Sequence, residues 1–179
     1  MRKIALCVAV VLLTTAFAAC GGLRAENGSD EEIQAVAAEA DLPEDAAPVV
    51  ADPQRAVEAI YESLENARVD RVPVEQLDEV FGIPPYMVVD AVAYISDVVG
   101  GLCDVVIIYP APGMTDQVRE ALNQYTTLRA DYFRNYDILN SYYIASNAIV
   151  FEQGDFVVML MLPDNTAGRE IIDLYLPAS

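Results

Sequence analysis

The hydrophobic pattern between residues 53 and 81 is helical. Four apolar residues stand three, four and seven positions apart, a spacing that places them on one face of an amphipathic helix: Val57, Ile60, Tyr61 and Leu64. Asp52 precedes them as an N-cap residue, and Pro53 follows in the first helical position. A second, shorter helix is predicted over residues 74–81, because Gly82 and the Pro84-Pro85 pair end the pattern there.

After residue 85 the pattern changes to that of β-strands. Residues 86–95 and 102–109 are rich in Val, Ile and Tyr, and the Gly100-Gly101 pair between them predicts a turn. Thr115 is then expected to cap a long helix with apolar residues along one face: Val118, Leu122, Tyr125, Leu128 and Tyr132.

The last third of the chain repeats this order of elements. A short helix or turn is predicted over residues 136–143. A second hairpin follows, formed by residues 148–152 and 155–162 around a tight turn at Gln153-Gly154. A final helix is expected over residues 164–176.

The order of these elements predicts an α+β domain. Residues 86–134 and 147–176 each form a strand-strand-helix unit. We therefore expect a four-stranded antiparallel sheet built from two such units, with its helices packed on one face and preceded by an N-terminal helix. Residues 53–179 are long enough for one core, and no pattern marks a second domain.

The first 19 residues have the pattern of a signal peptide. Arg2 and Lys3 form a short basic region, and residues 4–19 are an apolar stretch that ends in small residues. As a helix this stretch would reach only about 24 Å, at about 1.5 Å of rise per residue. The hydrocarbon core of a bilayer is roughly 30 Å thick, so a permanent transmembrane helix is disfavoured.

The end of the signal resembles a lipobox. In bacterial lipoproteins, the cysteine of a motif such as Phe17-Ala18-Ala19-Cys20 is joined to diacylglycerol and becomes the new N-terminus. An aliphatic residue is more usual at the position of Phe17. Ala16-Phe17-Ala18 also fits ordinary signal cleavage, which would release a protein that begins at Ala19. Lipidation is the favoured interpretation, so the bilayer is the expected partner, through acylated Cys20, on the outer face of the cytoplasmic membrane.

Residues 20–52 are predicted to be the lipidated cysteine and a disordered acidic linker. Nine acids and no base lie between Glu26 and Asp52, and few large apolar residues are present to form a core. Residues 31–40 have the spacing of a marginal helix. The expected organisation is therefore signal peptide, tether and a single folded domain.

Charge and composition exclude several classes of function. Removal of the signal leaves eight arginines and 28 acids, a formal charge of −20, with no lysine and no histidine. This charge argues against binding to nucleic acid and to anionic lipid heads. Histidine is the commonest general base and metal ligand, and lysine is the commonest amine nucleophile, so neither kind of chemistry is available to the mature chain. Cys7 leaves with the signal and Cys20 carries the lipid, so Cys103 has no disulfide partner and no zinc site or cofactor is predicted.

Four short segments carry a resemblance to a known family: Ala93-Tyr94-Ile95-Ser96, Asp104-Val105-Val106-Ile107-Ile108, Tyr136 after the long helix, and Asn147-Ala148-Ile149-Val150 before Gly154. Over roughly residues 53–176 the chain resembles bacterial lipoproteins that carry the domain of unknown function numbered 4358. The resemblance implies a lipoprotein signal and an acidic linker. Asp104 stands where the family pattern has glutamate, and no catalytic residue is transferred, because the family has no assigned activity.

Aromatic residues after position 124 form the main candidate binding site. The tyrosines and arginines in this part of the chain can form a platform for a sugar or a peptide, and the candidate ligand-binding residues are Arg129, Tyr132, Arg134 and Tyr136. The helical spacing of Tyr125 and Tyr132 equally suits a core face. In that interpretation, which is the favoured one, Arg129 and Arg134 pair with Asp131 and Asp137 in solvent.

The remaining candidates have simpler structural explanations. Cys103 lies within a predicted strand and is expected to be a small buried apolar residue. Glu152 with Asp155, or Asp164 with Glu170, offers carboxylates for weak calcium binding, but turn and helix-cap roles explain these acids well. We therefore predict no metal site and assign no catalytic residue.

Three classes of function are consistent with these observations. The favoured one is a non-enzymatic binding or scaffolding module at the membrane surface, which recognises a peptide, a glycan or another envelope protein. A carboxylate-dependent hydrolase would need two acids that face each other in a deep cleft, at least one of them with a raised pKa. An accessory lipoprotein of a transport or signalling complex would need a coherent apolar patch, on the order of several hundred Å².

Overall fold

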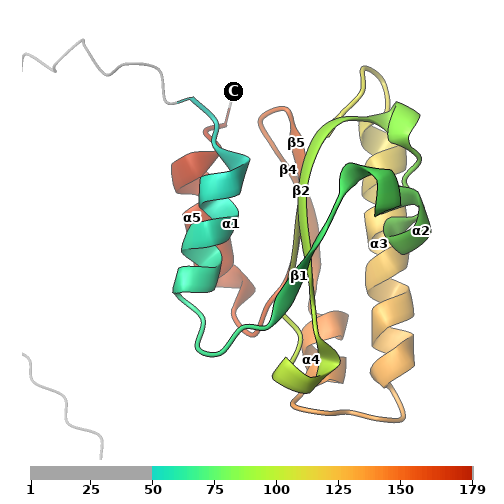
Figure 1. Ribbon diagram of the computed structural model, residues 1–179, viewed down its shortest axis with the longest axis vertical. Helices are drawn as coiled ribbons and strands as arrows, with labels where there is room; N and C mark the ends of the chain where they lie inside the picture. Colours follow the sequence, from blue (N-terminus) through green and yellow to red (C-terminus); the bar gives the residue numbers. More distant parts are fainter. Residues whose placement is uncertain (1–49, 179) are drawn as a thin grey trace, which may run out of the picture. The chain divides into compact units, whose positions relative to one another are not determined.

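The computed structural model describes residues 50–178 (Figure 1). The signal peptide, Cys20 and almost all of the linker lie outside the described residues, so the expectations for them stay predictions. Within residues 50–178, no helix combines the length and the apolar character that crossing a bilayer requires.

Five strands form one antiparallel sheet in the order β1-β2-β3-β5-β4. Their bounds are Val69–Val72 for β1, Val88–Ser96 for β2, Asp104–Pro110 for β3, Ile149–Gln153 for β4 and Phe156–Met161 for β5. The expectation of an antiparallel sheet is confirmed, but the prediction of four strands is wrong. The additional strand is β1, a four-residue edge strand with two charged residues in its middle, and short charged strands are typical of sheet edges.

Within residues 50–178, five α-helices and three 3₁₀ turns surround the sheet. The helices are α1 (Pro53–Glu62), α2 (Leu77–Phe81), α3 (Thr115–Phe133), α4 (Ser141–Ser146) and α5 (Asn165–Tyr175). The turns are η1 (Val74–Gln76), η2 (Pro85–Met87) and η3 (Val98–Gly100). The mixed α+β class is therefore confirmed.

The helices lie on both faces of the sheet, so the prediction of helices on one face is wrong. Helices α1 and α5 cover one face, and α2 and α3 cover the other (Figure 1). Residues 105–108 of β3 are an unbroken apolar run, and successive side chains of a strand point to opposite faces. Val105 and Ile107 pack in the core under α1 and α5, whereas Val106 and Ile108 pack in the core under α2 and α3. Both faces had to be covered to bury this run.

Three helix ends form as the sequence predicts, but the prediction that Thr115 caps α3 is wrong, because Met114 is the N-cap residue and no side chain caps this helix. The Asp52 side chain accepts a hydrogen bond from the Arg55 backbone N–H and caps α1. Asp164 caps α5 in the same way, through the N–H groups of Thr166 and Ala167. Helix α2 ends at Gly82, whose φ of 68° lies in the left-handed region that glycine adopts without steric cost.

A third, smaller core closes one end of the sheet. It contains five buried residues from β5, α3, α4 and the segment before β3: Leu102, Phe133, Ile144, Ala145 and Met161. The C-terminal end of α3, the helix α4 and the β2–β3 connection all lie at this end (Figure 1). The chain enters the domain at the opposite end, where the Asp52 N–H donates to the Tyr175 carbonyl at 3.0 Å.

Candidate functional site

A buried carboxylate lies where β3 begins. Asp104 has no exposed surface, and within residues 50–178 it is the only charged side chain that is fully buried. Its Oδ1 accepts hydrogen bonds from the Ser96 backbone N–H at 2.7 Å and from the Ser96 hydroxyl. Its Oδ2 accepts from the Tyr125 hydroxyl at 2.8 Å and lies 3.4 Å from Nε of Arg129. Asp104 therefore joins β2, β3 and α3 through one carboxylate.

Arg129 points inward from α3 toward this carboxylate. Its side chain is 20% exposed, and its guanidinium carbon lies 5.9 Å from the ring centre of Tyr125 and 5.5 Å from that of Phe133. Nε makes no hydrogen bond in the described structure, so its contact with Asp104 is an ion pair without hydrogen-bond geometry. The expectation that Arg129 pairs with a solvent-exposed acid is wrong. Arg134 does pair with Asp131 in solvent, at 2.6 Å.

The residues around Asp104 hold the β2–β3 connection in place. The Ser96 hydroxyl accepts a hydrogen bond from the Cys103 N–H at 3.1 Å, and the Tyr61 hydroxyl donates to the Cys103 carbonyl at 2.9 Å. Burial raises the pKa of Tyr61 and of Tyr125 above the ordinary tyrosine range. Burial, followed by the charge of Asp104, raises the pKa of the Cys103 thiol to about 11. The thiol is therefore neutral at pH 7, in agreement with its predicted structural role.

This connection forms one wall of a cavity of about 260 Å³. We call it the end cavity, and its lining comes from the connections between elements: Leu64, Glu65, Ala67, Gly100, Gly101, Leu102, Cys103, Leu139, Ile144 and Pro163. The walls are mostly apolar side chains and glycine backbone. Among the described residues of the lining, Glu65 is the only charged one.

Large exposed side chains are frequent between positions 128 and 143, the part of the chain that contains Leu139 of the end-cavity lining. Six of the twelve exposed large hydrophobic residues in the described range fall between positions 128 and 143, and we call them the tyrosine surface: Leu128, Tyr132, Tyr136, Leu139, Tyr142 and Tyr143. Tyr132 and Tyr136 are 66% and 68% exposed, so they do not belong to the core. Tyr125 and Phe133 take the core positions instead.

The last turns of α3 explain this difference. The first part of α3 packs on the sheet through Val118 and Leu122. Toward its C-terminal end α3 packs with α4 through Phe133, which lies on a different side of the helix from Tyr132. The spacing of Tyr125 and Tyr132 is helical, but at the end of α3 Phe133 takes the buried position and Tyr132 is exposed. The sequence pattern alone contained no signal for this choice between the two neighbouring aromatic residues.

Residues 62–162 match the family model described as Domain of unknown function (DUF4358). The chain belongs to this family. No curated protein and no solved structure matches the chain.

The part of the chain matched by the family model contains the site. All five strands, α3 and α4 lie within it, and with them Asp104, the tyrosine surface and most of the end-cavity lining. Most of α1 and all of α5 lie outside the matched residues. The family description assigns no activity to this domain, so what the site can bind depends on the residues of this chain.

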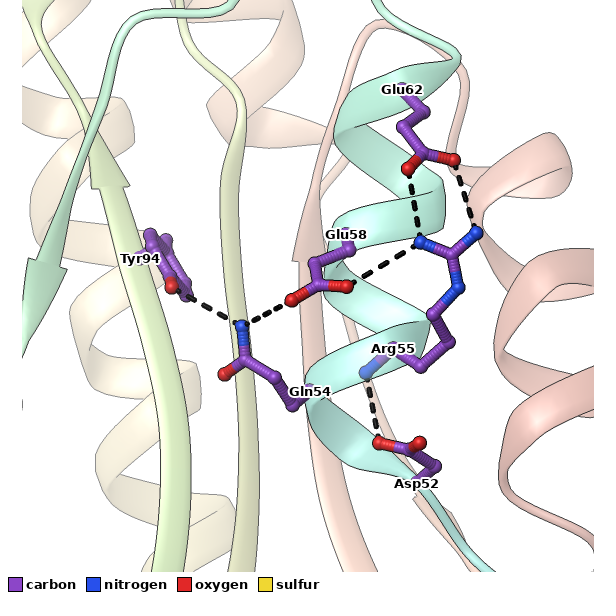
Figure 2. Close-up of polar contacts among 6 residues, drawn as sticks. All are labelled: Asp52, Gln54, Arg55, Glu58, Glu62 and Tyr94. Carbon is purple, nitrogen blue, oxygen red and sulfur yellow. Dashed lines mark hydrogen bonds and ion pairs between the residues drawn. The ribbon is translucent and has the colours of Figure 1, made fainter.

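A second polar network lies on the outer surface of α1 (Figure 2). Arg55 contacts Glu62 at 2.9 Å and Glu58 at 3.4 Å, and the Gln54 amide donates to Glu58 at 3.0 Å and to the Tyr94 hydroxyl at 3.5 Å. A hydrogen bond from Arg55, together with its charge, holds the pKa of Glu62 below its usual range. This network occupies its carboxylates with partners from the same helix. It leaves no free pair of acids for catalysis there.

Two of the four acids singled out in the sequence, Glu152 and Asp164, have structural partners. Glu152 forms an ion pair with Arg119, although it lines an open hollow together with Asp155. Asp164 caps α5. In the described part of the chain, no group of three or more His, Cys, Asp or Glu residues could hold a metal ion.

Proposed function

We propose that this protein is a lipid-anchored extracytoplasmic binding module, and that the tyrosine surface and the end cavity contact its envelope partner. The observation that carries the proposal is the gathering of six large exposed side chains between positions 128 and 143. Monomeric proteins rarely expose contiguous apolar groups without a binding role. Tyrosine is well suited to such a role, because it combines a rigid apolar ring with a hydrogen-bonding hydroxyl.

The charges around the tyrosine surface support binding rather than solubility as its role. The whole chain has a formal charge of −18. Within positions 128–143, however, Arg134 is paired with Asp131, Arg129 with the buried Asp104, and Asp137 accepts a hydrogen bond from the Tyr142 N–H. A nearly neutral surface on a strongly acidic protein lowers the electrostatic cost of contact with a partner.

The position of the site also fits a tethered module. The described chain begins at the end of the sheet opposite α4, and α4 carries Tyr142 and Tyr143 of the tyrosine surface (Figure 1). Asp104, the one fully buried carboxylate among the described residues, is enclosed by Ser96, Tyr125 and Arg129 and lines no cavity described above. A binding role is therefore better supported than hydrolysis.

Anchoring is tested by intact mass. The membrane fraction of the native host should contain a species with the mass of diacylglycerol added at Cys20. The medium should contain little or none of the protein. The Cys20→Ala variant should lose both the added mass and the membrane association. An unmodified chain in the medium that begins at Ala19 would contradict the anchor.

Binding at the tyrosine surface is tested by site-specific photocrosslinking in intact cells. Benzoylphenylalanine placed at position 132 or 136 should give a discrete adduct. The same group at Gln117, which is exposed on the first part of α3, is the matched control and should give none. Equal labelling at 117 and 132, or no adduct at 132 and 136 in a folded and membrane-bound protein, would contradict the proposal.

A further inference from the structure

The end cavity has the size and the walls of a site for one apolar group. Its volume of about 260 Å³ is just below the roughly 300–1,000 Å³ of sites for drug-sized ligands. Leu64, Leu102 and Ile144 supply apolar walls, and Gly100 and Gly101 let the backbone line the cavity without side chains. Cys103 adds a neutral thiol. These walls suit a single side chain together with its adjoining backbone.

A strained residue stands at the edge of this cavity. Leu139 has a φ of 51° and is followed by Asn140 with a φ of 62°, so two consecutive residues without a glycine adopt the left-handed conformation. For an ordinary side chain this conformation is sterically unfavourable. Leu139 is nevertheless 61% exposed, so burial does little to offset the cost. Strain of this kind concentrates at ligand-binding segments, where it holds a side chain ready for contact.

The charge at the cavity favours a cation. Glu65 is exposed, and it forms no ion pair with any residue in the range 50–178. Over the same range 20 acids stand against seven arginines, a formal charge of −13. A ligand that places an apolar group in the cavity therefore gains further by placing a positive charge beside Glu65.

We propose that the end cavity binds a basic peptide segment, in which one apolar side chain enters the cavity and a neighbouring Lys or Arg contacts Glu65. The proposal rests on the binding role proposed above and adds the chemical class of the partner. The tyrosine surface then contacts the flanking part of the same peptide, because Leu139 belongs to both the cavity lining and the tyrosine surface.

The test uses the full chain, labelled with ¹⁵N in non-ionic detergent, and three acetylated tripeptide amides. The probe is Lys-Leu-Lys, and the controls are Lys-Ser-Lys, which lacks the apolar group, and Glu-Leu-Glu, which reverses the charge. Lys-Leu-Lys should shift the amide resonances of Gly100, Gly101 and Ile144 in a saturable manner, and added salt should weaken the effect. Lys-Ser-Lys should bind at least about tenfold more weakly, since it loses the apolar group. Glu-Leu-Glu should bind at least about threefold more weakly, since it loses the ion pair with Glu65 and is repelled by it.

Variants separate the two interactions. Glu65→Gln should weaken Lys-Leu-Lys about three- to fivefold, the factor that corresponds to the loss of one solvent-accessible ion pair. Glu120→Gln removes an exposed charge from α3 outside the cavity lining and should leave the affinity unchanged. Ala67→Leu should fill the cavity and abolish the shifts, and its own amide spectrum reports whether the variant is folded.

Three outcomes would overturn the proposal: no saturable shift with Lys-Leu-Lys, equal shifts with all three peptides, or shifts that map away from the cavity. These outcomes are distinguishable from failure of the binding role. An adduct at position 132 without a response to Lys-Leu-Lys would keep the binding module and reject the basic peptide. A response to Lys-Leu-Lys without an adduct at position 132 or 136 would keep the end cavity as a site for a basic peptide and reject the tyrosine surface as a contact with the partner.

Discussion

The protein contains two arginine–carboxylate networks that differ mainly in burial. Arg55 contacts two carboxylates on the surface of α1, and every member of that contact is well exposed (Figure 2). Arg129 contacts Asp104, which has no exposed surface, and packs against two aromatic rings. The chemistry is the same, but water screens the first network and is excluded from most of the second. Removing one partner should therefore cost far more in the second network than in the first, because it leaves a buried charge without compensation.

The two networks also differ in what they connect. The ion pairs of Arg55 lie within one helix, so their loss leaves the arrangement of the domain unchanged. Asp104 connects Ser96 in β2 with Tyr125 and Arg129 in α3. Through Ser96 and Cys103 it also determines the position of the connection that lines the end cavity. The buried network therefore stabilises the fold and positions the proposed binding site.

The largest effect is expected from Asp104→Ala. This change removes the acceptor for the Ser96 and Tyr125 donors and leaves the Arg129 charge largely buried without its partner. The free energy of unfolding should fall by about 3–5 kcal/mol, as measured by urea denaturation. Asp131→Ala breaks the exposed pair with Arg134 and is the matched control, with an expected loss below about 1 kcal/mol. Similar losses in the two variants would contradict the comparison.

A smaller loss is expected from Tyr125→Phe. The variant removes the hydroxyl that donates to Asp104 but keeps the ring that packs edge-on against Phe81 at 4.7 Å. A hydrogen bond to a charged group contributes about 1.5–3 kcal/mol, so a loss in that range is expected in urea denaturation. Tyr132→Phe is the control, because Tyr132 is exposed, and its stability should be unchanged. If Tyr125→Phe leaves the free energy of unfolding unchanged, the contacts with Ser96 and Arg129 alone are sufficient for the Asp104 carboxylate.

The sequence predicts the local structure better than the arrangement of the layers. Caps at Asp52 and Asp164 and the break at Gly82 are local chemistry, and the structure contains all three. Strand β1 carries two charges in four residues, so it lacks the apolar alternation by which strands are recognised. The unbroken apolar run of β3 did indicate that helices cover both faces of the sheet, because a strand with one solvent-exposed face alternates apolar and polar residues.

The site is less predictable, because it depends on where elements end. Alternation places Asp104 on the same face as Val106 and Ile108, which is a sequence signal for a buried charge. Its partner could not be predicted, since Arg129 reaches Asp104 only through the packing of α3 on the sheet. The exposure of Tyr132 likewise follows from tertiary structure, because the last turns of α3 pack through Phe133 and not through Tyr132.

Alkaline pH should weaken the buried region selectively. A raised pKa means that the folded state holds its proton more tightly than the unfolded state, so stability is complete below the unfolded pKa and falls as the pH rises toward the folded one. For Cys103 this window lies between about pH 9 and pH 11. Between pH 8 and pH 10 the thiol alone should cost about 1 kcal/mol in urea denaturation. Tyr61 and Tyr125 add to the loss, because burial raises their pKa values as well.

Cys103→Ala and Tyr125→Phe give the controls for this pH dependence. Each variant should reduce the slope of stability against pH above pH 8, whatever its effect on stability at pH 7. Tyr136→Phe changes an exposed tyrosine and should leave the slope unchanged. An unchanged slope in both Cys103→Ala and Tyr125→Phe would show that the alkaline loss comes from groups outside the buried region.

The smallest effect is expected on the surface of α1. Glu62→Gln removes the main partner of Arg55, but both groups are exposed, so urea denaturation at pH 7 should detect no change. Because Arg55 lowers the pKa of Glu62, any contribution of the pair is present above the unfolded pKa and is lost as the pH falls through the lower folded value. Glu65→Gln, which removes a charge without an ion pair in the described residues, is the matched control. If Glu62→Gln destabilises the protein as much as Tyr125→Phe, burial is not what distinguishes the two networks, and the role given to Asp104 must be reassigned to the connections that α1 makes.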